Sequence, residues 1–298
     1  VVCIQEPFNL ETSTDSMPYR FDHWFPYTPG MKDREAVYQA LEKTMEFRHV
    51  PPMPPHLSAY RALRRKTRIR LENTGHRWKG KRPLLKDPLA LFSAEDLVER
   101  FNLDVVCMVR HPLGFCSSLK KWDWKFPFAH LLEQPALIKR HFNEEADEIA
   151  EFAREEQPIV RQAALLWNLF HKVIRTYQKS HPDWHFPRHS EMVADPMPRF
   201  EALYKKLGLS FTPSVSDRLS DSLHSGKGET SRTVYQPRDA ASVSQTWKNR
   251  LTEEEIEHII SKTEELRLHF YPEETDPAKA QECLAMWGWS SAVEEAVR

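Results

Sequence analysis

Short continuous runs of apolar residues alternate along the chain with segments in which apolar residues recur at the spacing of an α-helix. Residues 1–4 are a β-branched run that ends at Glu6 and Pro7, where proline stops regular structure. Residues 104–110 form the clearest predicted strand, because their apolar run is continuous, as in a parallel strand buried on both faces. Two further strands are predicted at 83–88 and 184–190.

In most of the remaining chain, apolar residues recur at the spacing of an α-helix. Apolar positions within 138–180 fall on one face, with a break at Pro158. Two helix starts carry capping-box chemistry, one at Ser93 and one at Thr252, which has Glu255 three positions on. The segment 211–245 is rich in Ser, Thr, Asp and Gly and is predicted to be a long loop. The other predicted helices are 33–46, 113–122, 198–207, which Gly208 ends, and 252–269.

Composition limits the classes of protein to consider. A chain of 298 residues with 40% hydrophobic content has room for one globular unit with insertions. Lys and Arg (42) nearly balance Asp and Glu (43), so no overall field recruits nucleic acid, and any anion site is local. Residues 61–82 hold ten basic residues against Glu72 alone. A solvated helix face is the simpler interpretation of that run, and a polyanion remains an alternative.

Cysteine use and hydropathy indicate a cytoplasmic protein. The four cysteines show no metal-ligand spacing and are interpreted as free thiols. The fourteen histidines also show no metal-ligand spacing, so we expect no metal site. No apolar stretch approaches the ~20 residues that span a bilayer. The chain begins at Val1, within a predicted strand, so we expect the natural protein to start earlier.

Arg110 follows the clearest strand, Pro112 comes two residues later, and Ser118 lies eight positions after the arginine. A guanidinium at a strand end offers a forked donor to phosphate, and a serine hydroxyl in the next helix adds another donor. An arginine here can instead pair with an acid or cap a turn.

This segment resembles the 3′-phosphate-binding segment of the sulfotransferases that use 3′-phosphoadenosine 5′-phosphosulfate. Three further segments are similar to that family in the same order along the chain. They are Lys86-Asp87-Pro88, the stretch 188–209, and Thr230-Ser231-Arg232 with Trp247-Lys248.

The resemblance implies a three-layer αβα fold with a central parallel sheet, as in P-loop NTPases. We expect one domain over residues 1–298, with 272–298 as a tail that docks, because it carries Trp287 and Trp289. Arg110 and Ser118 would bind the 3′-phosphate. Ser231 and Arg232 would close over the nucleotide, ahead of Trp247 and Lys248, and the product would be adenosine 3′,5′-bisphosphate.

Glu6 and Lys86 are the catalytic candidates. The resemblance places Lys86 near the bridging oxygen of the donor. It makes Glu6 the general base, as in carbohydrate and tyrosyl-protein sulfotransferases, because a carboxylate can accept the proton of the acceptor hydroxyl. An N-cap or an ion pair is the other interpretation of Glu6.

Two departures from the family pattern stand out. A Gly-rich phosphate loop is absent from the sequence, and we expect it to precede Val1. The histidine base of the cytosolic small-molecule branch is also absent near Lys86, where Asp87 stands. The second departure favours Glu6 as the base.

The acceptor is expected to be a small alcohol, a sugar or a peptide that offers a hydroxyl or an amine. Trp122, Trp124 and Phe126 follow the predicted phosphate-binding helix and would line the acceptor pocket or belong to the core. Two other functions remain open. One is an inactive nucleotide-binding interaction protein of the same fold, and the other is a P-loop kinase-like phosphotransferase, which would need Mg²⁺.

Overall fold

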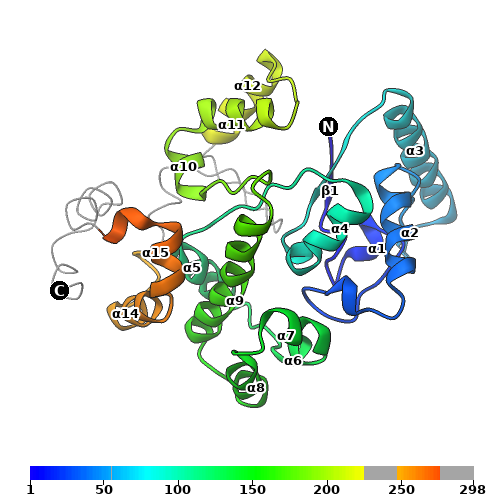
Figure 1. Cartoon of the computed structure of the whole chain (residues 1–298). Coiled ribbons are helices and arrows are strands. Elements are labelled where there is room, and N and C mark those ends of the chain that lie inside the picture. The colour runs from blue at the N-terminus through cyan, green and yellow to red at the C-terminus, as the bar shows by residue number, and fades with distance from the viewer. Residues whose placement is uncertain (55, 225–246, 276–298) are drawn as a thin grey trace. The chain divides into compact units, whose positions relative to one another are not determined.

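The computed structural model describes residues 1–54, 56–224 and 247–275 (Figure 1). Within them the chain is mostly helical and has one two-stranded parallel sheet. It divides into two compact units, which are described separately. Unit 1 comprises Val1–Leu103 and Pro127–Glu155, and unit 2 comprises Asp104–Phe126 and Glu156–Arg298. In the described part of the chain, no helix is long and apolar enough to cross a membrane.

The sheet of unit 1 joins the first predicted strand to the second. Strand β1 (Val2–Gln5) pairs in parallel with β2 (Pro83–Lys86), and the register aligns Gln5 with Lys86. The Glu6 N–H donates to the Lys86 carbonyl at 2.9 Å, which extends the pairing one residue beyond β1. Both strand predictions are confirmed, and the carboxyl ends of the two strands lie side by side.

Helices and aromatic side chains form the rest of unit 1. Fully buried phenylalanines pack in pairs, with ring centroids 4.7 Å apart for Phe8 and Phe21 and 5.3 Å apart for Phe92 and Phe142. The helices of this unit are α1 (Ser13–Ser16), η1 (Thr28–Gly30), α2 (Arg34–Met45), α3 (Ala59–Trp78), η2 (Pro88–Ser93), α4 (Ala94–Phe101), α6 (Ala129–Leu132), α7 (Pro135–His141) and α8 (Ala146–Arg154).

The capping box predicted at Ser93 is wrong. The Ser93 hydroxyl makes no cap hydrogen bond to α4. It accepts instead from the Thr28 N–H at 3.0 Å and donates to the Pro26 carbonyl at 2.6 Å. Thr28 also bonds to Asp96, which binds Arg34 as well. Ser93 is buried, so its hydroxyl satisfies loop groups that water does not reach.

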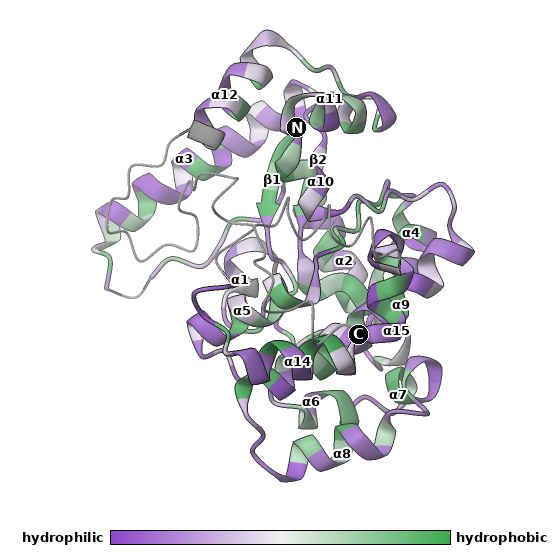
Figure 2. Cartoon of the chain, turned by 90° about the vertical axis from the view of Figure 1, so that its left-hand side faces the viewer, coloured by the Kyte–Doolittle hydropathy of each residue, from purple (hydrophilic) through white to green (hydrophobic). Residues whose placement is uncertain are grey.

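Unit 2 is built around a long helix. In α9 (Ile159–Ser180) every position of the predicted apolar face is buried, including Trp167 and Tyr177. Helix α5 (Pro112–Trp122) packs against α9 and α14 (Glu253–Lys262) in one apolar cluster (Figures 1 and 2). The other helices are α10 (His189–Ala194), α11 (Pro196–Lys206), α12 (Pro213–His224), α15 (Glu264–Phe270) and η3 (Pro272–Thr275).

The strand predicted at 104–110 is not buried on both faces. This segment makes two isolated parallel bridges, Val106 with His185 and Val109 with Arg188. Val106 is 37% exposed and Met108 is 43% exposed. The predicted strands 104–110 and 184–190 therefore do pair in parallel, but only through these bridges. In the first segment Val106 and Met108 meet solvent, and the second segment turns into α10 at His189.

Two other predictions need correction, and two are confirmed. Helix α12 occupies Pro213–His224, within the segment predicted to be a loop, and residues 225–246 of that segment lie outside the described residues. The final helix divides at Thr263 into α14 and α15. The Thr252 capping box is present. Cys3, Cys107 and Cys116 are free thiols, as predicted.

Candidate functional site

Glu6 lies in the turn that directly follows β1. Its backbone has a φ of 41°, a left-handed conformation that is uncommon for a residue with a side chain. This turn brings the carboxylate onto the neighbouring strand end, where Lys86 Nζ donates to Glu6 Oε1 at 2.5 Å. Asn9 Nδ2 donates to Glu6 Oε2 at 3.0 Å. The structure thus brings the two catalytic candidates together as an ion pair, with 30% and 38% of their side chains exposed.

The surroundings of Glu6 keep its side chain ionised. Partial burial opposes the charge, but hydrogen bonds from Lys86 and Asn9, with the charge of Lys86, hold the pKa of Glu6 below its usual range. At neutral pH the side chain is a carboxylate and can accept a proton. Sequence reasoning did not identify Asn9, because side chain contacts within a turn depend on its conformation.

Asp87 is the second carboxyl group at this sheet edge. Its Oδ2 accepts from the Phe8 N–H at 2.6 Å, and its Oδ1 accepts from the Leu89 N–H at 2.9 Å. Burial, together with the neighbouring charge of Glu6, raises the pKa of Asp87 to about 7, although those two backbone donors act in the opposite direction. Both oxygens are engaged by the main chain, so Asp87 fixes the turns after β1 and β2.

Arg110 ends the extended segment of unit 2 and reaches along α5. Trp167 Nε1 of α9 donates to the Arg110 carbonyl at 2.8 Å, which fixes the backbone there. The guanidinium Nη2 donates to Ser118 Oγ at 3.0 Å. It passes over Gly114, where a Cβ would already contact Arg110 Nε at 3.5 Å. The structure therefore brings Arg110 and Ser118 together over the first turns of α5.

The positive charge of Arg110 affects the pKa of His189 at the start of α10. Burial and the positive charge of Arg110 together lower the pKa of His189 to about 4. The His189 N–H also donates to the Val109 carbonyl at 2.8 Å. The imidazole of His189 is therefore neutral at neutral pH.

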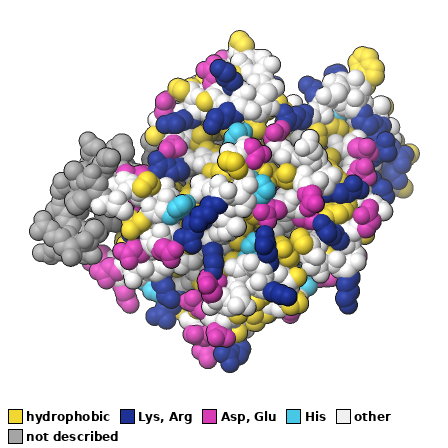
Figure 3. Space-filling model, viewed as in Figure 1, with side chains coloured by type: hydrophobic (Ala, Val, Ile, Leu, Met, Phe, Trp, Pro, Cys, Tyr) yellow, Lys and Arg dark blue, Asp and Glu magenta, His cyan; other side chains and the backbone are white. Residues whose placement is uncertain are grey.

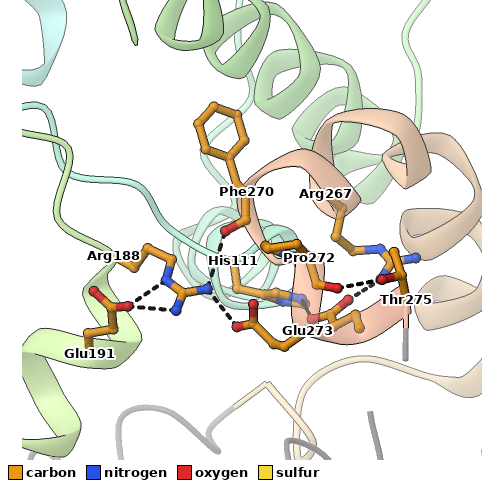
Figure 4. A network of polar contacts seen from close by, with 9 residues as sticks. His111, Arg188, Glu191, Arg267, Phe270, Pro272, Glu273 and Thr275 are labelled. Atoms are coloured by element: carbon orange, nitrogen blue, oxygen red, sulfur yellow. Dashed lines mark hydrogen bonds and ion pairs between the residues drawn. The ribbon is translucent and has the colours of Figure 1, made fainter. Parts of the chain in front are cut away.

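The residue between Arg110 and Pro112 belongs to a buried network (Figure 4). His111 Nδ1 accepts from the Leu113 N–H at 3.3 Å, so the proton of the neutral ring is on Nε2, which lies 3.1 Å from Glu274 Oε1. Glu274 also pairs with Arg267. The network thus holds the start of α5 to the end of α15 and to η3.

Arg188 holds a second part of this network (Figure 4). It donates to Glu191 at 2.6 Å and to Glu273 at 2.6 Å, and its guanidinium lies over the Tyr271 ring at 5.4 Å from the centroid. Arg188 thus ties the start of α10 to η3. The contacts of Arg188 with Glu273 and of His111 with Glu274 were not predicted, because they join residues 85 and 163 positions apart.

Of the four other predicted nucleotide-binding residues, two can be placed and two cannot. Trp247 is only 4% exposed and packs in the apolar cluster with Leu113 and Cys116 of α5. Lys248 lies over the Trp247 ring, with Nζ 5.8 Å from the centroid. Trp247 thus supports the helix that carries Ser118. Ser231 and Arg232 lie outside the described residues.

The three candidate acceptor residues have different surroundings. Phe126 is buried, and its N–H donates to the Gln162 side chain at 3.1 Å. Its ring contacts Trp124, with centroids 5.8 Å apart. Trp122 is 61% exposed, and Lys121 Nζ lies 4.9 Å from the centroid of its ring. The structure therefore brings Trp124 and Phe126 together, with Phe126 in the core.

No protein-family model matches this chain, and neither the curated proteins nor the solved structures include a significant match.

Proposed function

We propose that the protein is a sulfotransferase that uses 3′-phosphoadenosine 5′-phosphosulfate. The observation that carries the proposal is the pairing of Arg110 with Ser118 at 3.0 Å over the first turns of α5. A guanidinium and a hydroxyl offer several donors to the oxygens of one phosphate. Helix N-termini favour anions as well, because their N–H groups and dipole carry partial positive charge.

The proposed reaction is an in-line transfer of the sulfuryl group. The acceptor oxygen or nitrogen bonds to sulfur, the bond from sulfur to the bridging phosphate oxygen breaks, and adenosine 3′,5′-bisphosphate leaves. Glu6 takes the proton of the acceptor, for which its ionised state at neutral pH is suited. Lys86 stabilises the charge that develops on the leaving oxygen. The reaction assigned to these residues needs no metal.

The proposal extends to residues with weaker support. Ser231, Arg232 and Lys248 would contact the nucleotide, and Trp247 would position α5. Trp122 and Trp124 would contact the acceptor, which we propose is a small alcohol, a sugar or a peptide. The three-layer fold around a central parallel sheet and the phosphate loop are part of the same proposal.

Nucleotide binding by titration calorimetry tests the donor assignment. The ligands are adenosine 3′,5′-bisphosphate and adenosine 5′-monophosphate, which differ only in the 3′-phosphate. We expect the wild type to prefer the bisphosphate, and Arg110→Ala to weaken bisphosphate binding about 10- to 150-fold, since a charged hydrogen bond contributes roughly 1.5–3 kcal/mol. Binding of the monophosphate should change little.

Arg199→Ala is the matched control, because Arg199 is an exposed arginine of the same unit. Equal wild-type affinity for the two nucleotides would show that the donor assignment is wrong. If the bisphosphate binds but no sulfuryl group is transferred, the inactive nucleotide-binding protein is the better description. If a chelator abolishes transfer, the kinase-like alternative is favoured.

A further inference from the structure

Helix α3 (Ala59–Trp78) of unit 1 has no buried residue along its 20 positions. It is anchored through its last turns, where Asn73 Nδ2 donates to the His49 carbonyl at 2.8 Å and Arg77 Nη1 donates to the Phe47 carbonyl at 3.2 Å. A helix of this length with no fully buried side chain gains little stability from packing. Its exposed face is therefore available to a partner.

Large apolar side chains form a stripe on the outer face of α3. Tyr60, Leu71 and Trp78 are separated by 11 and 7 residues, which are whole numbers of turns, so they fall on one line along the helix. Leu63 lies one turn after Tyr60. The exposed fractions are 68% for Tyr60, 63% for Leu63, 68% for Leu71 and 85% for Trp78. We call these four residues the α3 stripe.

Basic side chains flank the α3 stripe on both sides. By helical position, Arg64 and Arg68 fall on one flank and Lys66 and Arg70 on the other. Figure 2 shows a largely hydrophilic helix interrupted by hydrophobic residues, and Figure 3 shows blue side chains gathered with yellow ones where Figure 1 draws α3. The run 61–82 has ten basic residues and one acidic residue, although the whole chain has a formal charge of −1. Positive charge is thus concentrated on this helix.

A basic cavity adjoins one flank of α3. It has a volume of about 540 Å³, and Arg48, Lys66, Arg70 and Arg77 contribute its cationic lining. None of the residues assigned to sulfuryl transfer lines it. A cavity with four cations is suited to hold a phosphate or carboxylate group close to the α3 stripe.

We propose that α3 binds the surface of an anionic lipid membrane. The α3 stripe enters the boundary between headgroups and acyl chains, the flanking arginines and lysines contact anionic headgroups, and the cavity holds one headgroup. Apolar residues in a line with cations on both sides fit a flat interface. Tyr60 and Trp78 stand near the two ends of the helix, and such rings favour the level of the headgroups.

A single-stranded nucleic acid is the main competing partner, because it also combines negative charge with stacking surfaces. The stripe favours the membrane, since Leu63 and Leu71 offer no aromatic face to a base. Both leucines instead gain from burial in an apolar phase. The proposal is independent of sulfuryl transfer, so neither proposal depends on the other.

Vesicle flotation with the whole protein tests this inference without any nucleotide. We compare vesicles of phosphatidylcholine alone with vesicles that contain about a quarter phosphatidylserine, and we expect binding to the anionic vesicles only, weakened by salt. Leu63→Gln/Leu71→Gln should weaken vesicle binding about tenfold or more, because the apolar contribution is lost. Glutamine suits a helix about as well as leucine and keeps the charge, and circular dichroism verifies the fold.

Further variants separate the electrostatic from the apolar contribution to vesicle binding. Arg64→Gln/Arg68→Gln should weaken binding about fivefold per residue. Met108→Gln, which alters another exposed apolar side chain, should bind vesicles as the wild type does. Poly-uridine RNA serves as the competing ligand. The proposal is overturned if the two-leucine variant binds anionic vesicles as tightly as the wild type, if the wild type binds neither kind of vesicle, or if RNA binds more tightly than vesicles.

Discussion

The buried pair between Arg267 and Glu274 gives a quantitative test of the network at the start of α5. The two side chains are only 10% and 15% exposed. Burial opposes the charge of Glu274, but His111 and Arg267 together hold its pKa below the usual range. Removing one partner of such a pair leaves the other charge buried, which costs roughly 3–5 kcal/mol. Since some water reaches this pair, we expect Glu274→Gln to lower the free energy of unfolding by about 3 kcal/mol.

A double-mutant cycle separates the pair from the effects of each residue alone. Arg267→Met/Glu274→Gln should be more stable than Glu274→Gln, because the double variant leaves no uncompensated arginine. Urea unfolding followed by tryptophan fluorescence measures the free energy of unfolding of Arg267→Met, Glu274→Gln and the double variant. An unchanged slope of this free energy against urea concentration shows that the unfolding transition is the same in each.

An exposed pair of the same unit provides the matched control. Arg175 and Glu265 lie 2.6 Å apart, but Glu265 is 81% exposed. Glu265→Gln should therefore cost less than about 1 kcal/mol. If Glu274→Gln costs no more than this control, or if the two substitutions of the cycle are additive, the Arg267–Glu274 pair is screened by solvent and our reasoning on the network is refuted.

Three further predictions concern ionisation and capping. The pKa of Asp87, about 7, lies above its unfolded value of about 4, so stability falls as pH rises between those values; urea unfolding of the wild type and of Asp87→Asn should diverge over that range. The pKa of His189, about 4, lies below its unfolded value of about 6.5. The contribution of His189 to stability is therefore complete above about pH 6.5 and is lost as the pH falls from about 6.5 to about 4. Arg110→Ala should raise the pKa of His189 in an NMR titration, and an unchanged pKa would contradict the placement of the guanidinium. Thr252→Ala should lower the free energy of unfolding by about 1 kcal/mol in urea unfolding, whereas Thr252→Ser should retain most of it.

Elements with strong local signals were predicted well from the sequence. Strands β1 and β2 end at Gln5 and Lys86, each two residues before a proline, whose missing N–H and ring stop a ladder. Helix α9 is long and its apolar period is regular, so its buried face follows from the spacing alone. The signal for α12 was also present, because Pro213 suits a first helical position and Val215 and Leu219 are four residues apart.

Elements that depend on distant partners were predicted less well. The apolar run at 104–110 indicates an extended segment, but sequence does not show how many neighbouring strands cover it, and Val106 and Met108 remain partly exposed. Ser93 has the right neighbours for a helix cap, yet its hydroxyl instead accepts a hydrogen bond from the N–H of Thr28, 65 residues earlier. The local sequence shows which contacts are chemically possible, and the tertiary structure determines which of them form.

The two residue pairs assigned to sulfuryl transfer, one in each unit, differ in the same way. Arg110 directly precedes α5, and its side chain reaches along the first two turns of that helix to Ser118, so this pairing joins residues only eight positions apart. Glu6 and Lys86 meet because the parallel register aligns two strand ends that are 80 residues apart. Removal of Lys86 would also remove the hydrogen bond and the charge that lower the pKa of Glu6. A loss of transfer activity in a Lys86 variant therefore reports on both residues at once, whereas Arg110→Ala leaves this pair untouched and tests donor binding alone.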